Sequence, residues 1–597
     1  MSAPVPCQPA GARTPPRGPS GGAPGLRVTS GQHSEAGRKP VNQDRHGLVV
    51  PPLPARAIKG IVAVIADGIS SSNVSQVAAE IAVAGFLDDY YSTPDSWGVK
   101  QSGERVLRAL NAWLHAHTRQ SRFRYDLDRG YLCTFSALVL KSATAHLFHV
   151  GDTRIYRMAG GLPEPLTTDH RLPLSASTDG LSRALGMDPH LEIDYRQLSV
   201  APGDVFLLAS DGVYEHLRPR DIATILARYP EDLTAAARAL VTAALSAGSP
   251  DNLTAQLVRI DALPEPRQHD ELGEPWQARP FAPEWQPGQT VDGFHILRTL
   301  HASSRSRVYL AQDLASGTEV VLKCPATELR EQPDALAAFQ AEEWVARRIH
   351  SPHVARPFAV DRPRSYRYLA LTYHPGRTLR QWLLDQPRPD LHRVRSLLEQ
   401  IAAGLRAFHR LAMAHGDLRP DNILVDDHGT VTLIDFGATQ VAGLQERAPD
   451  PGPHLPRGAA LYSAPESFLG QPASAASDQF SLAVIAYQML TGQLPYGAEI
   501  PKTRSLSQQR RLRPRPLAAD RPDLPGWLEP ALKRALAIEP HRRYPALSEF
   551  LFDLSRPRPD WQQRHRPPWM TRHPVAFWQG ISALLLLALL ATWAGRV

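Results

Sequence analysis

Residues 415–424 read HGDLRPDNIL, and residues 433–438 read LIDFGA. Together they are the most informative pair of motifs in this 597-residue chain. They lie in a globular block, residues 291–556, that opens with the short strand-like runs FHILRTL, RVYLAQD and EVVLK. The block then becomes mainly helical, as at residues 392–411. A small strand-rich half followed by a larger helical half predicts a bilobal domain.

A second globular block, residues 27–262, precedes it and has a different pattern. Apolar runs typical of strands alternate with helical stretches at residues 74–90 and 231–247. The strand-like runs are IVAVIA (61–66), AHLFHV (145–150), DVFLLAS (204–210) and LTAQLVRI (253–260). The sequence therefore predicts a multidomain α+β protein with two folded domains of different architecture.

Composition limits the classes of protein to consider. With 43% hydrophobic and 21% charged residues, the chain has the make-up of a globular protein. Its three cysteines, Cys7, Cys133 and Cys324, lie far apart, which excludes a disulfide framework and a cysteine-rich zinc module. The net charge is +7, and a basic run occupies residues 502–521. Because that run falls inside the second block, we expect a solvated or docking surface there and no nucleic-acid partner.

Proline-rich stretches mark the boundaries of the two blocks. Residues 1–26 show no apolar periodicity and should form a disordered leader. Residues 263–290 have the composition of a linker. Within it, Trp276, Phe281 and Trp285 are candidate anchors onto a neighbouring domain.

The C-terminal end combines a basic segment with an apolar one. Residues 557–573 lie in an arginine-rich stretch, and residues 574–595 follow as an apolar run with no charge between 575 and 594. About twenty apolar residues are enough to span a hydrocarbon layer of ~30 Å, so we expect a transmembrane helix, with a buried helix as the alternative. The basic residues before it predict a tail anchor, in a bacterial inner membrane, with both domains in the cytoplasm.

The motif pair in the second block resembles the catalytic loop and metal-binding motif of Hanks-type protein kinases. The resemblance implies a bilobal protein-kinase fold that transfers phosphate from ATP to serine or threonine of proteins. Asp417 would orient and deprotonate the substrate hydroxyl. Asn422 and Asp435 would hold Mg²⁺ against the ATP phosphates, and Lys323 in EVVLK would contact the α- and β-phosphates.

The same resemblance assigns two ion pairs. Glu342 would be the helix partner of Lys323, with the adjacent Glu343 as the alternative. SAPE (463–466), SDQFSLAV (477–484) and EPHRRY (539–544) match later kinase motifs. Within them, Glu466 and Arg543 would form a buried ion pair.

The nucleotide loop departs from the kinase pattern. LHASSRSRVYLA (300–311) has His301, Ser303 and Ser306 where glycines normally let the backbone approach the phosphates, and Val308 follows. We expect these four residues to line the ATP site and ATP to bind weakly. Arg419 replaces the usual lysine near the transferred phosphoryl group, which keeps the charge but changes its shape.

A further departure concerns activation. Gly416 stands where most kinases have the arginine that pairs with a phosphorylated activation loop. Residues 440–462 contain no serine or threonine. We infer that phosphorylation of that loop does not activate this domain.

Acidic residues in the first block follow its apolar runs, in IVAVIADG, LFHVGDTR and VFLLASDG, and one precedes LTAQLV in PDN. Carboxylates at strand ends can converge at one edge of a sheet. Hard divalent cations prefer such all-oxygen sites.

The ordered motifs resemble the type 2C, metal-dependent protein serine/threonine phosphatases. They are GRKPVNQD (37–44), ADGIS (66–70), CTFSA (133–137), VGDTRIY (150–156), TTDH (167–170), SRALG (182–186), ASDGV (209–213) and SPDNLT (249–254). The resemblance implies an α/β sandwich, two β-sheets flanked by helices, with two or three Mg²⁺ or Mn²⁺ ions that activate water. The implied metal residues are Asp44, Asp67, Gly68, Asp211 and Asp251, with Asp152 for a third ion.

Two residues of the first block are candidates for contact with the substrate phosphate. Lys39 stands where many members carry an arginine, and Arg38 lies beside it, so phosphate binding would depend on one or both. His170 is a further candidate, as the acid for the leaving group, although a lone histidine is more often structural.

The expected function is therefore a bifunctional protein kinase and phosphatase acting on protein substrates, with ATP and divalent cations as cofactors. The alternative is an active phosphatase whose kinase-like half serves as a scaffold that binds ATP or a partner.

Overall fold

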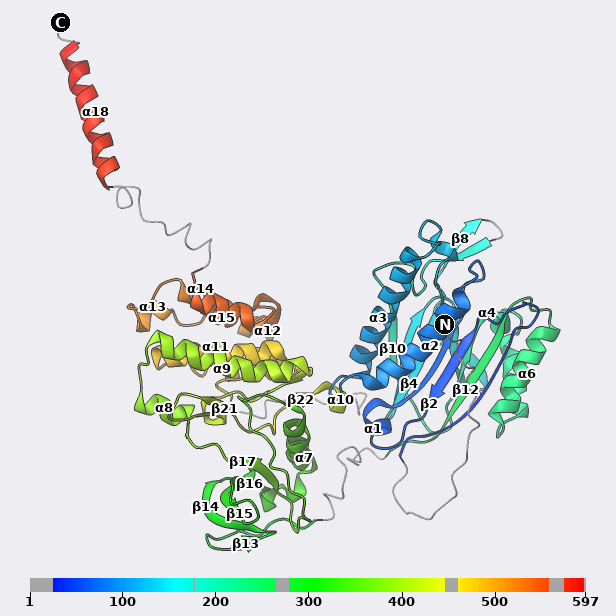
Figure 1. Ribbon diagram of the computed structural model, residues 1–597, viewed down its shortest axis with the longest axis horizontal. Helices are drawn as coiled ribbons and strands as arrows, with labels where there is room; N and C mark the ends of the chain where they lie inside the picture. The colour runs from blue at the N-terminus through cyan, green and yellow to red at the C-terminus, as the bar shows by residue number, and fades with distance from the viewer. Residues whose placement is uncertain (1–24, 176–177, 265–278, 446–459, 558–573, 595–597) are drawn as a thin grey trace, which may run out of the picture. The chain divides into compact units, whose positions relative to one another are not determined.

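The computed structural model describes residues 25–175, 178–264, 279–445, 460–557 and 574–594. The chain divides near residue 273 into two compact units, which we describe separately (Figure 1). Nearly all of the predicted leader, the first half of the predicted linker and the basic segment before the C-terminal helix lie outside the described residues.

The N-terminal unit contains two five-stranded antiparallel sheets. The first sheet has the order β1 (Arg27–Glu35), β12 (Leu253–Ala262), β11 (Val205–Ala209), β6 (Arg154–Ala159) and β7 (Leu162–Pro165). The second has the order β10 (Asp194–Ser199), β5 (Thr144–Val150), β4 (Phe135–Lys141), β3 (Ile61–Ala66) and β2 (Arg45–Val49).

Helices cover the outer faces of both sheets (Figure 1). The longer ones are α2 (Ser75–Ser92), α3 (Val99–Gln120) and α6 (Leu233–Ser246), and the shorter ones are α1 (Ala55–Lys59), α4 (Asp211–Tyr214) and α5 (Pro219–Arg228). The helices predicted at 74–90 and 231–247 are thereby confirmed as α2 and α6.

The position of strand β3, packed on both faces, explains why its sequence is apolar throughout. Val62 and Val64 pack with α2 and α3, whereas Ile61 and Ile65 pack against the other sheet, beside Phe206. A strand buried on both faces needs apolar residues at every position. The predicted sandwich of two sheets flanked by helices is what the N-terminal unit forms.

A short hairpin extends from this unit next to the strand ends. It consists of β8 (Arg171–Ser175) and β9 (Thr178–Leu181). Its first residue follows His170, whose backbone N–H donates to the Gly151 carbonyl at 2.8 Å. This bond places the start of the hairpin beside the loop that follows β5.

The C-terminal unit begins with a five-stranded antiparallel sheet and one helix. The sheet order is β13 (Thr290–Val291), β14 (Phe294–Ala302), β15 (Ser306–Asp313), β16 (Glu319–Pro325) and β17 (Leu369–Thr372), and the helix is α7 (Pro333–Arg348). Of the three predicted anchors, Trp276 lies outside the described residues, and Phe281 and Trp285 belong to this half. Trp285 is 2% exposed and packs with Tyr309 and Tyr368.

The rest of the C-terminal unit is mainly helical, as the sequence predicted. Its helices are α8 (Leu379–Asp385), α9 (Leu391–Arg410), α10 (Ala442–Gln445), α11 (Ala475–Thr491), α12 (Leu506–Gln509), α13 (Leu517–Asp520), α14 (Leu528–Ala535) and α15 (Leu547–Ser555). Short strands lie among them: β18 (Arg377–Thr378), β19 (Met413–Ala414), β20 (Ile423–Val425), β21 (Val431–Leu433) and β22 (Gln440–Val441). The predicted bilobal order of strands before helices is confirmed.

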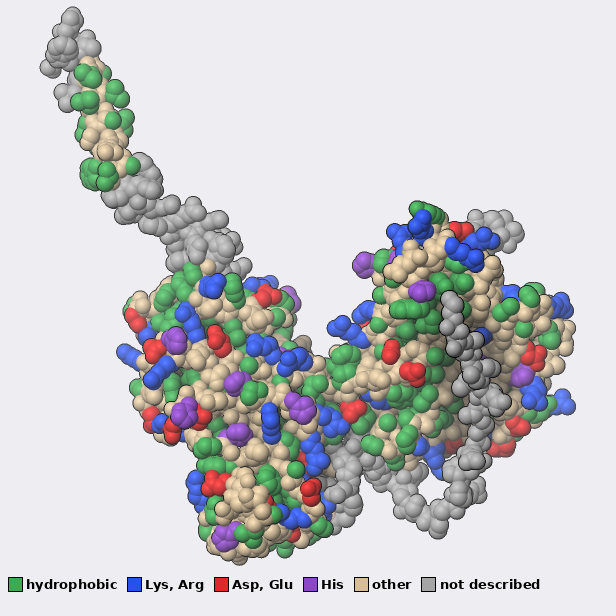
Figure 2. Space-filling model, in the orientation of Figure 1, with side chains coloured by type: hydrophobic (Ala, Val, Ile, Leu, Met, Phe, Trp, Pro, Cys, Tyr) green, Lys and Arg blue, Asp and Glu red, His purple; other side chains and the backbone are tan. Residues whose placement is uncertain are grey.

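The C-terminal apolar segment forms the helix α18 (Pro574–Ala594), which exposes Leu584, Leu585, Leu586, Leu587 and Leu590 (Figure 2). No helix among the described residues is long and apolar enough to cross a membrane, so the predicted transmembrane helix is not supported.

Candidate active sites

The acidic residues of the N-terminal unit gather where strands of both sheets end. Asp67 follows β3, Asp152 follows β5, and Asp211 follows β11 at the start of α4. Asp44 directly precedes β2, and Asp251 lies two residues before β12. The two sheets thus bring together carboxylates that are separated by up to two hundred residues in sequence.

The carboxylate of Asp44 is held firmly on one side only. Its Oδ2 accepts hydrogen bonds from the hydroxyls of Ser210 at 2.8 Å and Thr254 at 2.7 Å. Its Oδ1 is buried and has no hydrogen-bond partner among the described residues, and the same holds for Oδ1 of Asp211. Leaving a buried oxygen atom without a hydrogen-bond donor costs free energy. This indicates that a cation or a water molecule contacts these two oxygens when the site is filled.

The pKa shifts of the clustered carboxylates also indicate that the cluster needs positive charge. Burial, followed by the charges of Asp44, Asp211 and Asp152, raises the pKa of Asp67 well above its ordinary value. Burial and neighbouring carboxylates raise the pKa of Asp211 to about 7. The described protein therefore supplies less positive charge than the ionised cluster needs. An all-carboxylate donor set of this kind fits Mg²⁺ or Mn²⁺.

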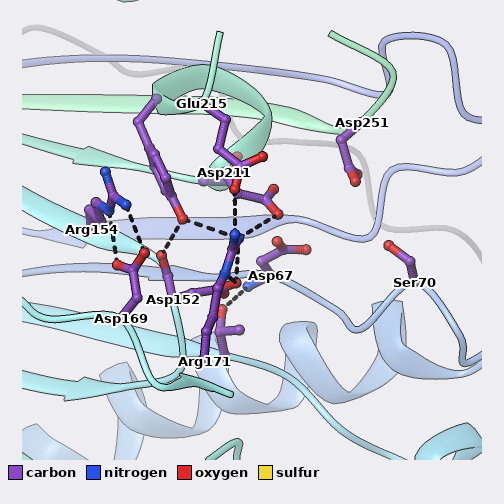
Figure 3. A network of polar contacts seen from close by, with 12 residues as sticks. Asp67, Ser70, Asp152, Arg154, Asp169, Arg171, Asp211, Glu215 and Asp251 are labelled. Atoms are coloured by element: carbon purple, nitrogen blue, oxygen red, sulfur yellow. Dashed lines mark hydrogen bonds and ion pairs between the residues drawn. The ribbon is translucent and has the colours of Figure 1, made fainter. Parts of the chain in front are cut away.

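The positive charge that is present comes mainly from Arg171, which the sequence prediction did not include (Figure 3). Its Nε donates to Asp152 Oδ2 at 2.8 Å, and its Nη1 donates to Glu215 Oε1 at 2.5 Å. Its Nη2 lies 3.4 Å from Asp211 Oδ2. The quoted motif TTDH ends one residue before Arg171, and no pattern in the sequence indicates that this side chain turns toward the cluster.

Among the described residues, no group of three or more acidic, histidine or cysteine side chains is arranged to hold a metal ion as it stands. The carboxylates face basic side chains instead: Asp152 faces Arg171, and Asp251 forms an ion pair with Lys39. The structure thus brings the six predicted metal residues together in one cluster. Their arrangement as metal ligands stays a prediction.

The two candidates for contact with substrate phosphate differ in their surroundings. Lys39 donates to Ser70 Oγ at 2.7 Å in addition to its ion pair with Asp251. Arg38 is exposed. Both partners of Lys39, Ser70 and Asp251, lie on the side of the cluster away from Arg171 (Figure 3).

Two further predicted residues hold the site together. His170 Nδ1 accepts a hydrogen bond from the Gly151 N–H at 3.0 Å, and its Nε2 lies 3.1 Å from Asp194. Both ring nitrogens are engaged, which favours a structural role for His170. Gly68 leaves no room for a side chain, because a Cβ there would lie 2.8 Å from the Ser75 backbone.

In the C-terminal unit, Lys323 on β16 lies between two carboxylates. Its Nζ is 2.8 Å from both Glu342 oxygens and 2.9 Å from Asp435 Oδ1. The Glu342 side chain is 1% exposed. Lys323 lowers the pKa of Asp435 to about 2. The three residues form a charge-paired group without any added cation.

The adjacent Glu343 has different partners, which settles the alternative left open by the sequence. Its Oε1 accepts from Arg364 Nη2 at 2.9 Å and from Arg347 Nη2 at 2.6 Å. Glu342 alone of the two pairs with Lys323.

The predicted base, Asp417, lies in a loop fixed by a buried network. Asn422 Nδ2 donates to the Asp417 carbonyl at 2.9 Å and to its Oδ2 at 3.1 Å. The buried carboxylate of Asp478 accepts the backbone N–H groups of His415 at 2.9 Å and Gly416 at 3.0 Å. Asp417 and Asn422 are therefore held side by side.

Gly416 suits the conformation of this loop. Its φ is +75°, and a Cβ there would lie 2.5 Å from the Ala438 carbonyl oxygen. A residue with a side chain would be strained at this position, by roughly 1–2 kcal/mol. Arg419, on the other side of Asp417 in sequence, forms a two-nitrogen ion pair with Asp421 at 2.9 and 2.6 Å.

The nucleotide loop is a tight hairpin between β14 and β15. Ser303 Oγ accepts the backbone N–H groups of Arg305 at 3.3 Å and Ser306 at 3.2 Å, and the Ser303 N–H donates to the Ser306 carbonyl at 3.0 Å. His301 pairs with Val308 in register. Several donors that a phosphate would need are thus engaged within the turn itself.

The predicted ion pair between Glu466 and Arg543 is confirmed. Its two nitrogen–oxygen contacts are both 2.7 Å, and both side chains are buried. Most of the predicted activation loop, residues 446–459, lies outside the described residues.

Comparison with known proteins agrees with this division. Residues 32–259 match the family model of protein phosphatase 2C, and residues 294–548 match that of the protein kinase domain. The chain is 30% identical over 267 residues to serine/threonine-protein kinase Pkn1 of Myxococcus xanthus, covering 44% of this chain and 38% of that protein. It spans between 29% and 38% of the length of the four curated relatives that it matches first.

Two solved structures resemble one unit each. The PknI kinase domain of Mycobacterium tuberculosis is 26% identical, with a TM-score of 0.36, and the match covers 46% of this chain and 99% of that one. PppA, described as a regulatory component of the T6SS in Pseudomonas aeruginosa, is 26% identical, with a TM-score of 0.33, and the match covers 40% of this chain and 99% of that one.

Proposed function

We propose that this chain, which carries a type 2C phosphatase domain and a protein kinase domain, is a bifunctional signalling enzyme. Its kinase domain transfers phosphate from ATP to serine or threonine of proteins. Its phosphatase domain hydrolyses phosphoserine and phosphothreonine. The observation that carries the proposal is that each unit brings together the acidic residues its chemistry needs, over long separations in sequence.

In the kinase domain, the contacts of Lys323 and Asp417 support the proposal. Lys323, fixed by Glu342, is placed to contact the ATP phosphates. Asp417, held by Asn422, orients the substrate hydroxyl and accepts its proton. Mg²⁺ bound with ATP at Asn422 and Asp435 would neutralise phosphate charge.

In the phosphatase domain, Asp67 and its carboxylate neighbours Asp44, Asp211 and Asp251 are the residues that would hold divalent cations. Bound Mg²⁺ or Mn²⁺ would make water nucleophilic near neutral pH and neutralise the phosphoryl oxygens. Lys39, beside Asp251, is placed to attract the substrate phosphate as a point charge. Ser210 and Thr254 orient the Asp44 carboxylate toward the cluster.

Two variants separate the activities. With labelled ATP and Mn²⁺, Asp417→Asn should lose protein labelling and keep phosphopeptide hydrolysis. Asp67→Asn should lose hydrolysis by more than about a hundredfold, since even residues outside the ligand shell cost 10- to 100-fold in metal affinity. If neither variant changes either activity, the proposed function is wrong.

Opposing activities on one chain suggest a shared target, including the kinase domain itself. Under this proposal, Asp67→Asn should accumulate more labelled phosphate on the chain than wild type does. Equal labelling of the two proteins would contradict the shared target while leaving both activities in place.

The nucleotide loop supports one alternative, a kinase-like domain that binds ATP or a partner without transferring phosphate. Ser303 engages loop donors within the turn, which weakens the phosphate cradle. The test compares wild type with Lys323→Ala and Asp417→Ala. Equal incorporation of labelled phosphate in all three would favour the alternative.

The place of the chain in the cell is a further proposal. The exposed leucines of α18, including Leu584 and Leu587, support attachment to a membrane. The arginine-rich stretch that precedes α18 in sequence favours the cytoplasmic side for both catalytic units. Co-sedimentation with vesicles of mixed neutral and anionic lipid should be lost when the chain ends at residue 573. Unchanged sedimentation of the shortened chain would contradict attachment through α18.

A further inference from the structure

We propose that the Arg171 guanidinium takes the place of a third metal ion at Asp152, so that the phosphatase site of this chain binds two divalent ions rather than three. The inference rests on the proposed phosphatase function and specifies the cation content of the site. Asp152 is the residue that the family resemblance assigns to a third ion.

Arg171 occupies the acidic pocket that such an ion would need. Its Nε and Nη2 both lie 2.8 Å from Asp152 Oδ2. Its Nη1 lies 2.5 Å from Glu215 Oε1, and its Nη2 lies 3.4 Å from Asp211 Oδ2 (Figure 3). One guanidinium thus contacts three carboxylates, and the fixed fork of donors on arginine suits this role.

The surrounding residues hold Arg171 in this position. Its neighbour His170 exchanges two hydrogen bonds with Gly151, the residue directly before Asp152. On the other side, the Tyr214 hydroxyl donates to the Asp152 carbonyl at 2.9 Å and lies 3.4 Å from Arg171 Nη2. The arginine and its acidic partner therefore start from backbone segments that are fixed to each other.

Arg154, another arginine of this network, is already neutralised (Figure 3). Arg154 forms two hydrogen bonds with Asp169, at 2.8 and 2.7 Å. Asp152 therefore draws its compensating charge from Arg171, and a divalent ion at Asp152 would stand next to a guanidinium and be repelled by it.

The contacts of Arg171 leave the rest of the cluster open. Among the described residues, Arg171 forms no hydrogen bond or ion pair with Asp67. Arg171 contacts Asp211 only through Oδ2, and the buried Asp211 Oδ1 has no hydrogen-bond partner in the described part of the chain. The same is true of Asp44 Oδ1. Two ions can thus be held by Asp44, Asp67, Asp211 and Asp251 without displacing the arginine.

The test measures how many Mn²⁺ ions the full chain binds, by equilibrium dialysis without ATP. An Asp435→Asn background removes the metal residue of the kinase domain. The chain with Arg171 unaltered should bind two Mn²⁺ ions, and the chain with Arg171→Ser should bind three. Adding Asp152→Asn to Arg171→Ser should return the count to two.

Control variants keep the test decisive. Arg171→Lys retains the charge and should bind two ions. Arg183→Ser removes a basic side chain that pairs with Glu192 and Asp194, outside the cluster, and should also bind two. If Arg171→Ser does not fold, Arg171→Met, which keeps the length without the charge, should give three.

Three ions with Arg171 unaltered, or two after its charge is removed, would overturn the inference. Binding of no Mn²⁺ by any of these proteins would instead overturn the proposed metal-dependent phosphatase.

Discussion

The two catalytic units both bring acidic residues together but balance their charge in different ways. In the kinase domain, Lys323 lies within 2.9 Å of both Glu342 and Asp435, and the pKa of Asp435 falls to about 2. In the phosphatase domain, burial and crowding raise the pKa of Asp211 to about 7 and that of Asp67 well above its ordinary value.

The difference indicates what each site needs before it can act. Lys323 keeps the Asp435 carboxylate ionised, whereas burial raises the pKa of Glu342 in spite of its contact with the same lysine. The contacts of this site are therefore present before ATP and its metal arrive. The phosphatase carboxylates are positioned by the two sheets but remain short of positive charge. Arg171 satisfies one side of that cluster, and added cations must satisfy the other.

The largest expected effect comes from removing the kinase base while leaving the charge-paired group intact. Asp417→Asn should lower the rate of phosphate transfer by about 10²- to 10⁴-fold, the usual contribution of a general base. Binding of ATP should change little, because Lys323, Glu342 and Asp435 are untouched. Measured kcat and the Kd of ATP check this, with phosphopeptide hydrolysis as the control. A loss smaller than tenfold would contradict the role of Asp417.

The stability of the two units should also respond differently to acid, because the phosphatase domain contains a buried histidine. His149 accepts from the Ser136 hydroxyl and donates to the Thr168 carbonyl, and burial lowers its pKa to about 4. A lowered histidine pKa contributes stability that is present above pH 6.5 and is lost as the pH falls toward 4. The loss amounts to about 3 kcal/mol.

Urea unfolding of wild type and His149→Asn, from pH 7.5 to 4, measures this contribution. The difference in unfolding free energy should shrink as the pH falls. The raised pKa of Asp211 acts in the opposite direction in metal-free protein, and the comparison with the variant removes it. A difference that does not depend on pH would contradict the assignment.

The adjacent glutamates of α7 provide a matched pair of variants whose expected effects on kinase activity are of intermediate size. Glu342→Gln should lower kcat/KM of the kinase by at least about tenfold, because a buried ion pair is broken. Glu343→Gln removes only a partner of Arg347 and Arg364. Because Glu343 does not pair with Lys323, the variant should lower kcat/KM by less than about twofold. Equal losses in the two variants would contradict the distinction between them.

The smallest expected effect concerns the nucleotide loop. Ser303→Gly removes the hydroxyl that engages the N–H groups of Arg305 and Ser306. The freed donors should lower the KM for ATP by about threefold, the scale of one net hydrogen bond. A higher KM would show that the serine turn assists nucleotide binding.

The sequence predicted much of this arrangement, because strands and motifs are local signals. Strand β3 follows from IVAVIA, and the carboxylate after it follows from the strand end. Phe281 and Trp285 were recognisable as anchors since aromatic residues are rare in linkers. The apolar composition of α18 was equally plain, although the membrane span predicted from it is not supported.

Other features depend on side-chain direction, which sequence does not specify. Glu342 and Glu343 are adjacent, and only the orientation of α7 decides which one faces Lys323. Arg171 belongs to a hairpin whose position is set by hydrogen bonds of His170 to Gly151. Such contacts arise from the tertiary fold and leave no periodic pattern.

The central claim is that the phosphatase domain requires added metal ions to balance its carboxylates, whereas the kinase domain contains a cation of its own, Lys323. Scanning calorimetry of the full chain, in EDTA and then in Mn²⁺ without ATP, tests it directly, since the two units should unfold in separate transitions. We predict that Mn²⁺ raises the Tm of one transition only, by binding the folded phosphatase domain, and that Asp67→Asn abolishes this shift. A shift of both transitions, or of neither, would contradict the account.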